Sequence, residues 1–329
     1  MIILTWLFIP FVTYFYFFRG SFIAELVISF LPYIMVAIFA VILILIVFLS
    51  VRKNKKSKLV TAFTIIFMIL LFWIGYLYSS EFFSFYNHSD ENIRLAENEW
   101  IKVFYANILY TNDNFKSLEQ KIEQENPDIV ILVEFSDDHE KEMKEFFKEK
   151  YPYMNRNSRS TMLAWDVVFS KKTIKNAITT WIEWKWGRKY SYMQIECENS
   201  DFECENDFDL YVVHTAAPVS IENFEMRNKQ LEQLWLNFYQ NKSENPTIVI
   251  WDFNLSPRSY YYKQLIKNWN LDNALSFQLP NRTRSLRQQK VFRSHIDQIF
   301  ISPEVKISEI NIEDLTWSDH RSFTFKFWL

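Results

Sequence analysis

Glycine is nearly absent from this chain of 329 residues, which contains only Gly20, Gly75 and Gly187. Proteins average roughly 7% glycine, so its turns have to be built largely without the residue that tolerates unusual backbone angles best. We therefore expect Asn, Asp, Ser and Pro to form the turns.

Cysteine is also scarce, since the chain contains only Cys197 and Cys204. No further Cys or His lies near them at the spacing of a zinc site, which disfavours structural zinc. Both lie in a polar, turn-like segment between two predicted strands. In an oxidising compartment they can close a small hairpin disulfide, and otherwise they are two free thiols.

An excess of positive charge is missing as well. The chain has 36 Lys and Arg against 39 Asp and Glu, and its net charge is −3. No global basic field therefore recruits nucleic acid to this protein.

Long apolar runs, in contrast, are present, and all of them precede residue 81. They cover about residues 2–18, 22–50 and 59–79. A bilayer is crossed by about 20 apolar residues, so we predict a membrane region over residues 1–80 with three transmembrane helices. A signal peptide is the alternative for the first run, but that run lacks a basic start and a small-residue cleavage site. A linker (81–98) and a catalytic domain (99–329) are predicted to follow.

Five cations lie between the second and third runs, in the segment Arg52-Lys53-Asn54-Lys55-Lys56-Ser57-Lys58. The positive-inside rule places this loop in the cytoplasm. With three spans, the catalytic domain then lies on the extracytoplasmic side of a multi-pass cell-membrane protein. A transporter or channel is a weaker alternative, because only Glu25 places an ionisable group near a predicted span.

From Trp100 onward, strand and helix patterns alternate without repeats or low-complexity linkers. This order predicts one α/β domain with many strands. The predicted strands cover residues 100–108, 128–133, 161–170, 189–195, 209–214, 247–250, 296–302, 306–312 and 322–328. The predicted helices begin near Phe115 and Ser136 and cover residues 221–240 and 259–269.

Polar and titratable residues recur where these strands end. Asp252 and Asn254 follow the apolar run 247–250, and an i, i+2 pair at the end of a strand projects to one side. Taken alone, Asp and Asn are ordinary turn formers. The pattern extends along the chain, however, to Asn107, Glu134, His214 and the pair Asp319-His320. Carboxylates suit Mg²⁺ or Mn²⁺, histidines can donate to a phosphate, and Asp252 can prepare an attacking water.

In these motifs the chain resembles the endonuclease/exonuclease/phosphatase superfamily, also called DNase I-like. The motifs are Asn107 after a strand, Val133-Glu134, His214, Asp252-Phe253-Asn254, Ile296-Asp297 and Ser318-Asp319-His320. The resemblance implies a four-layer fold of two packed mixed β-sheets flanked by helices. It also implies that Glu134, Asp319 and Asn107 form the metal site, that Asp252 and Asn254 prepare the nucleophile, and that His214 and His320 contact the phosphate. Asp297 is expected to pair with His320.

Within this superfamily the chain is most similar to a membrane-anchored branch with about three N-terminal spans. That branch has an Arg-Asn-x-Gln-Leu motif on a helix, here Arg227 to Leu231. Arg227 and Asn228 are therefore candidate substrate ligands, and a solvated helix face is the alternative. The superfamily usually has Gly before the Asp of its Asp-Phe-Asn motif, where this chain has Trp251. We expect Trp251 to narrow the site or stack on substrate.

A basic segment precedes Ile296 and is read either as a solvated loop or as an anion clamp. Its cations are Arg282, Arg284, Arg287, Lys290 and Arg293.

The sequence thus predicts a membrane-embedded hydrolase of phosphodiesters or phosphomonoesters that depends on Mg²⁺ or Mn²⁺. Its substrate is a lipid phosphate, a nucleotide or a nucleic acid, and no obligate protein partner is evident. The alternative, motivated by Trp251, is a weak or inactive member that binds a phosphorylated ligand or partner at the cell envelope.

Overall fold

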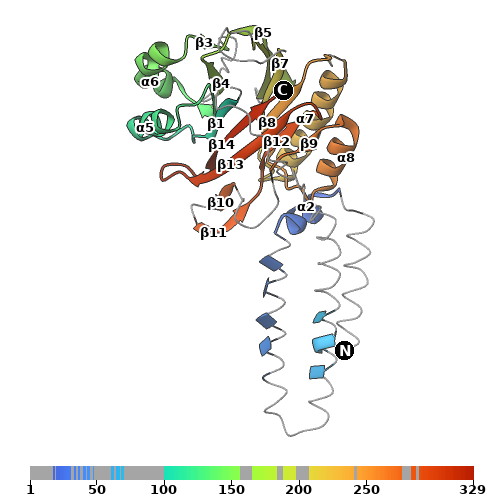
Figure 1. Cartoon of the computed structure of the whole chain (residues 1–329). Coiled ribbons are helices and arrows are strands. Elements are labelled where there is room, and N and C mark those ends of the chain that lie inside the picture. The colour runs from blue at the N-terminus through green and yellow to red at the C-terminus, as the bar shows by residue number, and fades with distance from the viewer. Residues whose placement is uncertain are drawn as a thin grey trace. The chain divides into compact units, whose positions relative to one another are not determined.

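The computed structural model describes residues 100–155, 165–183, 188–197, 207–240, 243–275, 283–286 and 289–329, residues 18 and 20–30, and scattered positions between 33 and 69. The chain divides into two compact units, shown in Figure 1. Unit 1 comprises residues 1–85 and 256–263, and unit 2 comprises residues 86–255 and 264–329. The predicted boundaries at residues 80 and 98 stay predictions.

Unit 1 contains helix α2 (Phe22–Ser29), which begins at the cap residue Ser21. Its Glu25 is only 4% exposed and accepts a hydrogen bond of 2.7 Å from the backbone N–H of Tyr260. A carboxylate suits this place, because the first amides of a helix lack partners within the helix. Most residues of the three predicted spans lie outside the described part. Within the described part, no helix is both long enough and apolar enough to span a bilayer.

Unit 2 is built on two six-stranded mixed sheets. The first has the order β13-β14-β1-β2-β4-β3 and the second β5-β6-β7-β8-β12-β9. The strands of the first are β13 (Lys306–Asp314), β14 (Arg321–Trp328), β1 (Ile101–Asn107), β2 (Ile129–Phe135), β4 (Trp165–Ser170) and β3 (Tyr153–Met154). Those of the second are β5 (Ile174–Glu183), β6 (Arg188–Ile195), β7 (Phe208–His214), β8 (Thr247–Asp252), β12 (Asp297–Ile301) and β9 (Asp272–Asn273). This confirms the predicted pair of mixed sheets.

The core between the sheets follows from the two-residue period of the strands. Ile248 and Ile250 of β8 point inward, as do Leu210 and Val212 of β7 and Val103 of β1. Parallel pairing occurs at the centre of each sheet, between β1 and β2 and between β7 and β8. These four strands therefore end at corresponding edges, where side chains with the inward alternation can meet.

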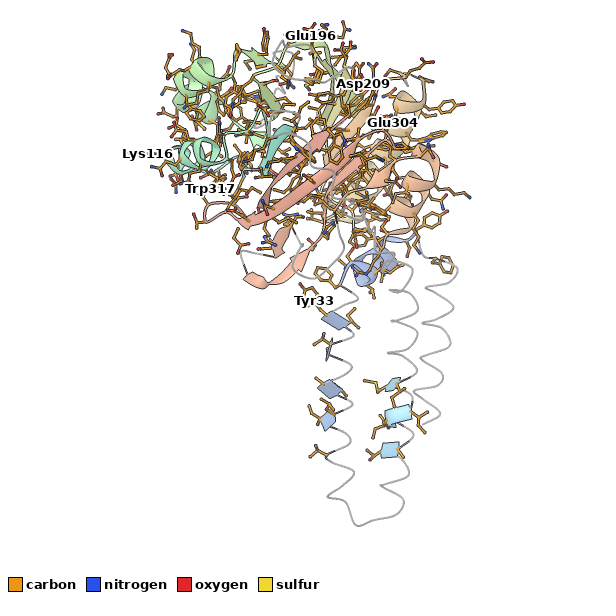
Figure 2. All side chains as sticks on the ribbon, in the orientation of Figure 1. Tyr33, Lys116, Glu196, Asp209, Glu304 and Trp317 are labelled. Atoms are coloured by element: carbon orange, nitrogen blue, oxygen red, sulfur yellow. The ribbon has the colours of Figure 1, made fainter. Side chains whose placement is uncertain are left out.

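Helices cover the outer face of each sheet. Helices α5 (Phe115–Glu125) and α6 (Asp137–Lys150) pack on the first sheet through Leu118, Ile122, Met143 and Phe147. Helix α7 (Ile221–Gln240) and the last part of α8 (Tyr260–Trp269) cover the second sheet, where Phe238 stacks on Trp269 with ring centroids 5.0 Å apart. Lys116 on α5 is exposed, whereas Asp209 at the start of β7 is only 1% exposed. Both residues are labelled in Figure 2.

Besides the two-residue strands β3 and β9, which were not predicted, the structure differs from the sequence-based expectation at three places. Strand β5 was not predicted, because its stretch alternates weakly between apolar and polar residues. The basic segment is not wholly a loop, since β10 (Arg284–Leu286) and β11 (Gln289–Ser294) form an antiparallel hairpin within it. Cys197 is disulfide-bonded, which overturns the reading as free thiols, and Cys204 lies outside the described residues.

Candidate active site

The polar residues predicted from the strand ends meet at one edge of both sheets. Asp252 ends β8 beside His214 of β7, with which it pairs in parallel register, and beside Asp297 of β12, with which it pairs antiparallel. These three positions continue the inward alternation of Ile250 and Val212 beyond the apolar core. The same alternation that buries the core therefore brings charged side chains together where the strands end.

Glu134 reaches this edge only because β2 is irregular. The pairing of β2 with β4 shifts register between Leu132 and Phe135, and Glu134 has a positive φ of 62°. In a regular strand Glu134 would face the outer helices, as Leu132 does. The bulge instead turns its carboxylate toward the site, where Asn107 and the backbone N–H of Tyr110 donate to it, each over 3.2 Å. Such strained positions are typical of functional sites.

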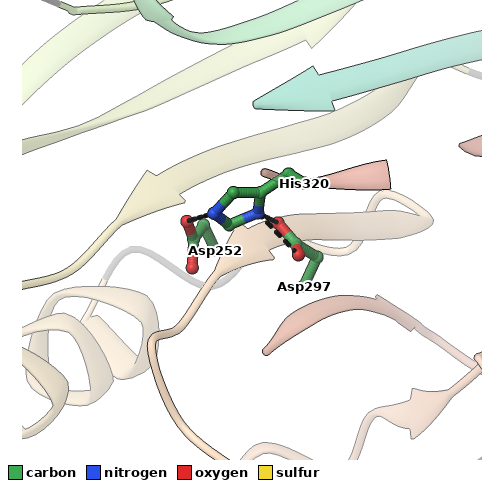
Figure 3. A group of neighbouring side chains, drawn as sticks. All are labelled: Asp252, Asp297 and His320. Carbon is green, nitrogen blue, oxygen red and sulfur yellow. Dashed lines mark hydrogen bonds and ion pairs between the residues drawn. The ribbon is translucent and has the colours of Figure 1, made fainter. Parts of the chain in front are cut away.

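The centre of the site is a chain of three buried ionisable groups, Asp297, His320 and Asp252 (Figure 3). Nδ1 of His320 lies 3.0 Å from Oδ2 of Asp297, and its Nε2 lies 3.7 Å from Oδ2 of Asp252. The expected pair of Asp297 with His320 is thus present. The hydroxyl of Tyr105 donates to Asp297 over 2.8 Å, and Thr283 accepts the backbone N–H of Asp297.

The charges of this chain are set by competition between burial and neighbouring groups. Burial disfavours the charged form of His320, but the carboxylates of Asp297 and Asp252 outweigh it and raise its pKa to about 9. Burial, reinforced by the charge of Asp297, raises the pKa of Asp252 to about 6. For Asp297, burial is outweighed by His320, so its pKa falls below the ordinary value. The site therefore holds an imidazolium between two carboxylates at neutral pH.

Asn107 does not have the orientation that the metal-ligand prediction requires. Its Oδ1 accepts the backbone N–H of Leu109 over 3.1 Å. Its Nδ2 consequently faces the carboxylates, donating to Glu134 over 3.2 Å and to Asp252 over 3.1 Å. Since an amide nitrogen is a hydrogen-bond donor and not a metal ligand, the geometry assigns Asn107 to holding the two carboxylates in place.

Asn254 is fixed from four directions in a left-handed conformation with φ of 47°. Its N–H donates to Oδ1 of Asp252, its Nδ2 to the carbonyl of Thr215, and its Oδ1 accepts from Nη1 of Arg284. Its carbonyl accepts from Nη1 of Arg227 over 3.1 Å. Backbone strain of this kind persists only where the surroundings determine the conformation.

The contact of Arg227 with the carbonyl of Asn254 bears on the predicted helix motif, Arg227 to Leu231. Arg227 is only 2% exposed, so it is not part of a solvated face, and its role as a substrate ligand stays a prediction. Its guanidinium also donates to Oδ1 of Asn228, which occupies the carbonyl oxygen of that residue. Gln230, one turn later, accepts the backbone N–H of Ala216. Helix α7 thus holds the loops that follow β7 and β8.

The expectation for Trp251 is corrected as well. Its side chain is fully buried, with 0% exposure. It stacks on Phe253 with ring centroids 3.5 Å apart and lies 5.5 Å from Trp269 of α8. Trp251 alternates with Ile250 and Asp252 and therefore lies on the outer face of the sheet, opposite to the site. It neither narrows the site nor presents a surface on which substrate can stack.

Two site residues were missed by sequence reasoning. Asp166 of β4 lies with Oδ1 3.9 Å from Nδ1 of His214, and Tyr105 is bonded to Asp297 as described. The other nitrogen of His214 lies 3.9 Å from Glu134 and 3.8 Å from Asp252. Asp166 and Tyr105 could have been found from the two-residue period, because they share the inward alternation of Val168 and Val103.

Asp319 lies on a loop that the β10–β11 hairpin holds. Oδ2 of Asp319 accepts from Nε of Arg284 over 3.1 Å, and its carbonyl accepts the N–H of Ser285 over 2.7 Å. Ser318 donates to the carbonyl of Asn107 and accepts the N–H of His320. Of the other cations in the basic segment, Arg282 and Arg287 lie outside the described residues.

The donor set is compatible with a divalent cation. Among the described residues, Asp252, Asp297 and His320 bring candidate ligand atoms within 4.8 Å of one another. The protonated imidazole of His320 cannot ligate a metal, however, and its two nitrogens already face carboxylates. Glu134 and Asp319 are better ligands, because their carboxylates are 21% and 18% exposed and leave room for water.

Comparison with known proteins gives one family and a set of similar folds. The model of the Endonuclease/Exonuclease/phosphatase family matches residues 104–320. No curated protein is significantly similar in sequence. Similar structures include humanized zebrafish (D. rerio) TDP2 (15% identity, TM-score 0.55, covering 70% of this chain and 100% of that one). The catalytic domain of human nocturnin with bound sulfate is 20% identical (TM-score 0.53, 71% and 96% covered). The mannosyl-6-phosphatase of Bacteroides thetaiotaomicron is 15% identical (TM-score 0.55, 70% and 100% covered). At these identities the structures show a shared fold.

Proposed function

Because the chain belongs to the endonuclease/exonuclease/phosphatase family, we propose that it is a metal-dependent hydrolase of phosphate esters. One observation carries the proposal: the ring of His320 lies between the buried carboxylates of Asp297 and Asp252 at the rim of both sheets, and they raise its pKa to about 9. This arrangement places a base and a cationic donor side by side. Attack of water on a phosphate requires both.

Asp252 is the residue we assign to the attacking water. A pKa of about 6 leaves it ionised at neutral pH but makes it a stronger base than an ordinary aspartate. The amide of Asn107 and the backbone N–H of Asn254 hold its two oxygens. The carboxylate therefore has a fixed direction before substrate arrives.

His320 and His214 are the residues we assign to the phosphate. Asp297 holds Nδ1 of His320 and keeps the ring charged, so its Nε2 proton is available to a phosphate oxygen beside Asp252. His214 lies on the other side of Asp252, 3.8 Å from the same carboxylate oxygen. Donors in this position stabilise the charge that develops on phosphate oxygens.

Glu134 and Asp319 are the residues that would hold Mg²⁺ or Mn²⁺. A bound divalent cation would supply Lewis-acid stabilisation of the phosphate oxygens. Asn107 and the N–H of Tyr110 orient the carboxylate of Glu134, and Arg284 orients that of Asp319. Oriented carboxylates of this kind are what metal sites need from the surrounding protein.

The structure removes the reason for the alternative, an inactive family member that only binds a ligand. That alternative rested on Trp251, which lies on the outer face of the second sheet and leaves the site unobstructed. The carboxylates and both histidines to which we assign roles in hydrolysis lie together at this edge of the sheets.

Membrane anchoring with an extracytoplasmic catalytic domain is part of the proposal. Its support is the three apolar runs before residue 81, the five cations of residues 52–58, and the disulfide-bonded state of Cys197. A reporter at the C-terminus that is active only outside the cytoplasm tests this topology. An inactive reporter there would contradict it.

The proposed activity is tested with the full chain in detergent against lipid phosphates, nucleotides and DNA. We expect hydrolysis with Mg²⁺ or Mn²⁺ and loss of turnover, by more than about 100-fold, when EDTA removes the metal. Re-addition of the metal should restore the rate. Turnover that is unaffected by EDTA, or no turnover with any phosphate ester, would contradict the proposal.

A further inference from the structure

The β10–β11 hairpin fixes Arg284 beside the catalytic histidine. Arg284 forms an isolated β-bridge with His320. The bridge is closed by hydrogen bonds from Ser285 N to the carbonyl of Asp319 (2.7 Å) and from Arg321 N to the carbonyl of Thr283 (2.6 Å). The backbone of Arg284 is therefore anchored on both sides, unlike that of a residue on a solvated loop.

The guanidinium of Arg284 joins the two sides of the site. Its Nε donates to Oδ2 of Asp319 over 3.1 Å, and its Nη1 donates to Oδ1 of Asn254 over 3.3 Å. In the proposed function, Asp319 holds the metal and Asn254 supports the base, and both serve one phosphoryl group. A cation bonded to both lies next to the scissile phosphate and not at a remote subsite.

Part of this guanidinium remains available to a ligand. Arginine has five N–H donors in a planar fork, and the two contacts above engage one on Nε and one on Nη1. Among the described residues, Nη2 and the second N–H of Nη1 have no hydrogen-bond partner, and the side chain is 36% exposed. The free edge of the fork can therefore donate to a phosphate oxygen that no other group of the site engages.

The negative charge of the surrounding carboxylates makes a free cationic group important for binding a phosphate. Five carboxylates surround the site, on Glu134, Asp166, Asp252, Asp297 and Asp319. They repel a substrate with two negative charges unless cations compensate. Arginine keeps its charge at every working pH, whereas a histidine is charged only when protonated.

We propose that Arg284 binds the scissile phosphate and makes the chain selective for phosphomonoesters over phosphodiesters. The inference rests on the proposed function and names the substrate class for the same site. A terminal phosphate has three non-bridging oxygens, whereas a diester has two. The metal site and the two histidines can engage two of them, and the Arg284 fork needs the third.

The reaction then consumes one water for each ester bond. The oxygen of water forms the new P–O bond, its proton passes to Asp252, and the bond between phosphorus and the ester oxygen breaks. The leaving oxygen takes up a proton, so the products are an alcohol and inorganic phosphate.

Two substrates with one leaving group test this inference, p-nitrophenyl phosphate and methyl p-nitrophenyl phosphate, which differ by a methyl group on one phosphate oxygen. In the full chain, Arg284→Gln removes the contacts to Asp319 and Asn254 and should slow both substrates. We expect kcat/KM for the monoester to fall on the order of 100-fold more than for the diester, because charge-assisted hydrogen bonds to the phosphate are lost only with the monoester. Arg284→Lys, which keeps the charge without the fork, should lie between. Equal losses on both substrates, or none, would overturn the proposal.

Arg321→Gln is the matched control, because Arg321 is also ion-paired with one carboxylate, Asp314, at 2.9 Å, but outside the site. It should change neither rate by more than about twofold. Binding of inorganic phosphate by calorimetry gives a readout that does not need turnover. Arg284→Gln should weaken it about tenfold or more, and Arg321→Gln should not. If the wild-type chain hydrolyses neither these two esters nor any lipid phosphate, nucleotide or DNA, the proposed function fails, while phosphate binding still decides the role of Arg284. A wild-type chain that binds no phosphate overturns that role.

Discussion

Two buried histidines distinguish the outer layer of the first sheet from the active site. His139 lies in the outer layer between Phe115 and Phe135, with ring centroids 5.2 and 5.6 Å away. Burial lowers its pKa to about 4, and the weak opposing influence of Asp138 does not change this. His320 is equally inaccessible, at 4% exposure against 0% for His139, yet its pKa is raised to about 9.

The difference teaches that burial alone does not decide ionisation. Both rings lose hydration, which favours the neutral form. His320 has two carboxylates close to its nitrogens, Asp297 at 3.0 Å and Asp252 at 3.7 Å, whereas Asp138 opposes the effect of burial on His139 only weakly. In the outer layer apolar contacts stabilise the fold, whereas at the strand ends the fold favours the charged forms of His320 and Asp297 and disfavours that of Asp252. The two regions should therefore respond in opposite ways to substitution.

The largest expected effect is at Asp252. Asp252→Asn should lower kcat/KM about 1000-fold, because the base that prepares the water is lost. Stability should change little. The folded state raises the pKa of Asp252 above that of the unfolded chain, so ionisation at pH 7 costs stability that the amide avoids. Steady-state kinetics and thermal unfolding of the same preparation check both.

Asp209→Asn is the matched control, since Asp209 is also 1% exposed but lies at the opposite end of β7. It accepts hydrogen bonds from Tyr192, Ser243 and Asn245. Its substitution should cost about 1 to 2 kcal/mol of stability and leave kcat/KM unchanged. Loss of activity in folded Asp209→Asn protein would contradict the comparison. Unchanged activity in Asp252→Asn would contradict it as well.

The sequence predicts the fold well, because strand periodicity is local information. Buried strands and the helix over residues 221–240 were identified from apolar spacing, and the structure confirms them. Strand β5 was missed, since its face is not uniformly apolar and its pairing with β6 is set by the rest of the sheet. Hairpin β10–β11 was missed for a related reason, because its strands are rich in polar residues and show no alternation of apolar and polar side chains.

Most of the residues that meet at the strand ends were predicted from the sequence, but their geometry was not. The positions of Asp252, His214 and Asp297 follow from their alternation with the core, and the motifs supplied the others. The inward turn of Glu134 depends on a bulge whose register is fixed by β4. The amide orientation of Asn107 and the burial of Arg227 depend on contacts across 145 and 27 residues of sequence. Trp251 shows the opposite case, because its alternation with Asp252 already indicated the outer face.

A smaller effect, on stability, is expected from the pH dependence of His139. Its folded pKa of about 4 lies below the ordinary value, so stability is complete above that value and falls as pH drops toward 4. Between pH 7 and 4.5 this group should account for about 2 kcal/mol. His139→Gln keeps a side chain that can complete the capping box with Ser136 but does not titrate. Urea unfolding at both pH values should show a shallower dependence for the variant, and parallel dependences would contradict the assignment.

The smallest effect is expected at Trp251, the neighbour of Asp252 on the opposite face. Trp251→Phe keeps a ring against Phe253 and Trp269 and removes the indole N–H, which is buried without a partner among the described residues. Loss of packing and relief of this unsatisfied donor oppose each other, so the free energy of unfolding should change by less than about 1.5 kcal/mol. Because the ring lies outside the site, kcat/KM should stay within about twofold of wild type. A large loss of kcat/KM at unchanged stability would mean that Trp251 acts on the site through the strand it shares with Asp252. The outer layer and the active site would then be one functional region and not two.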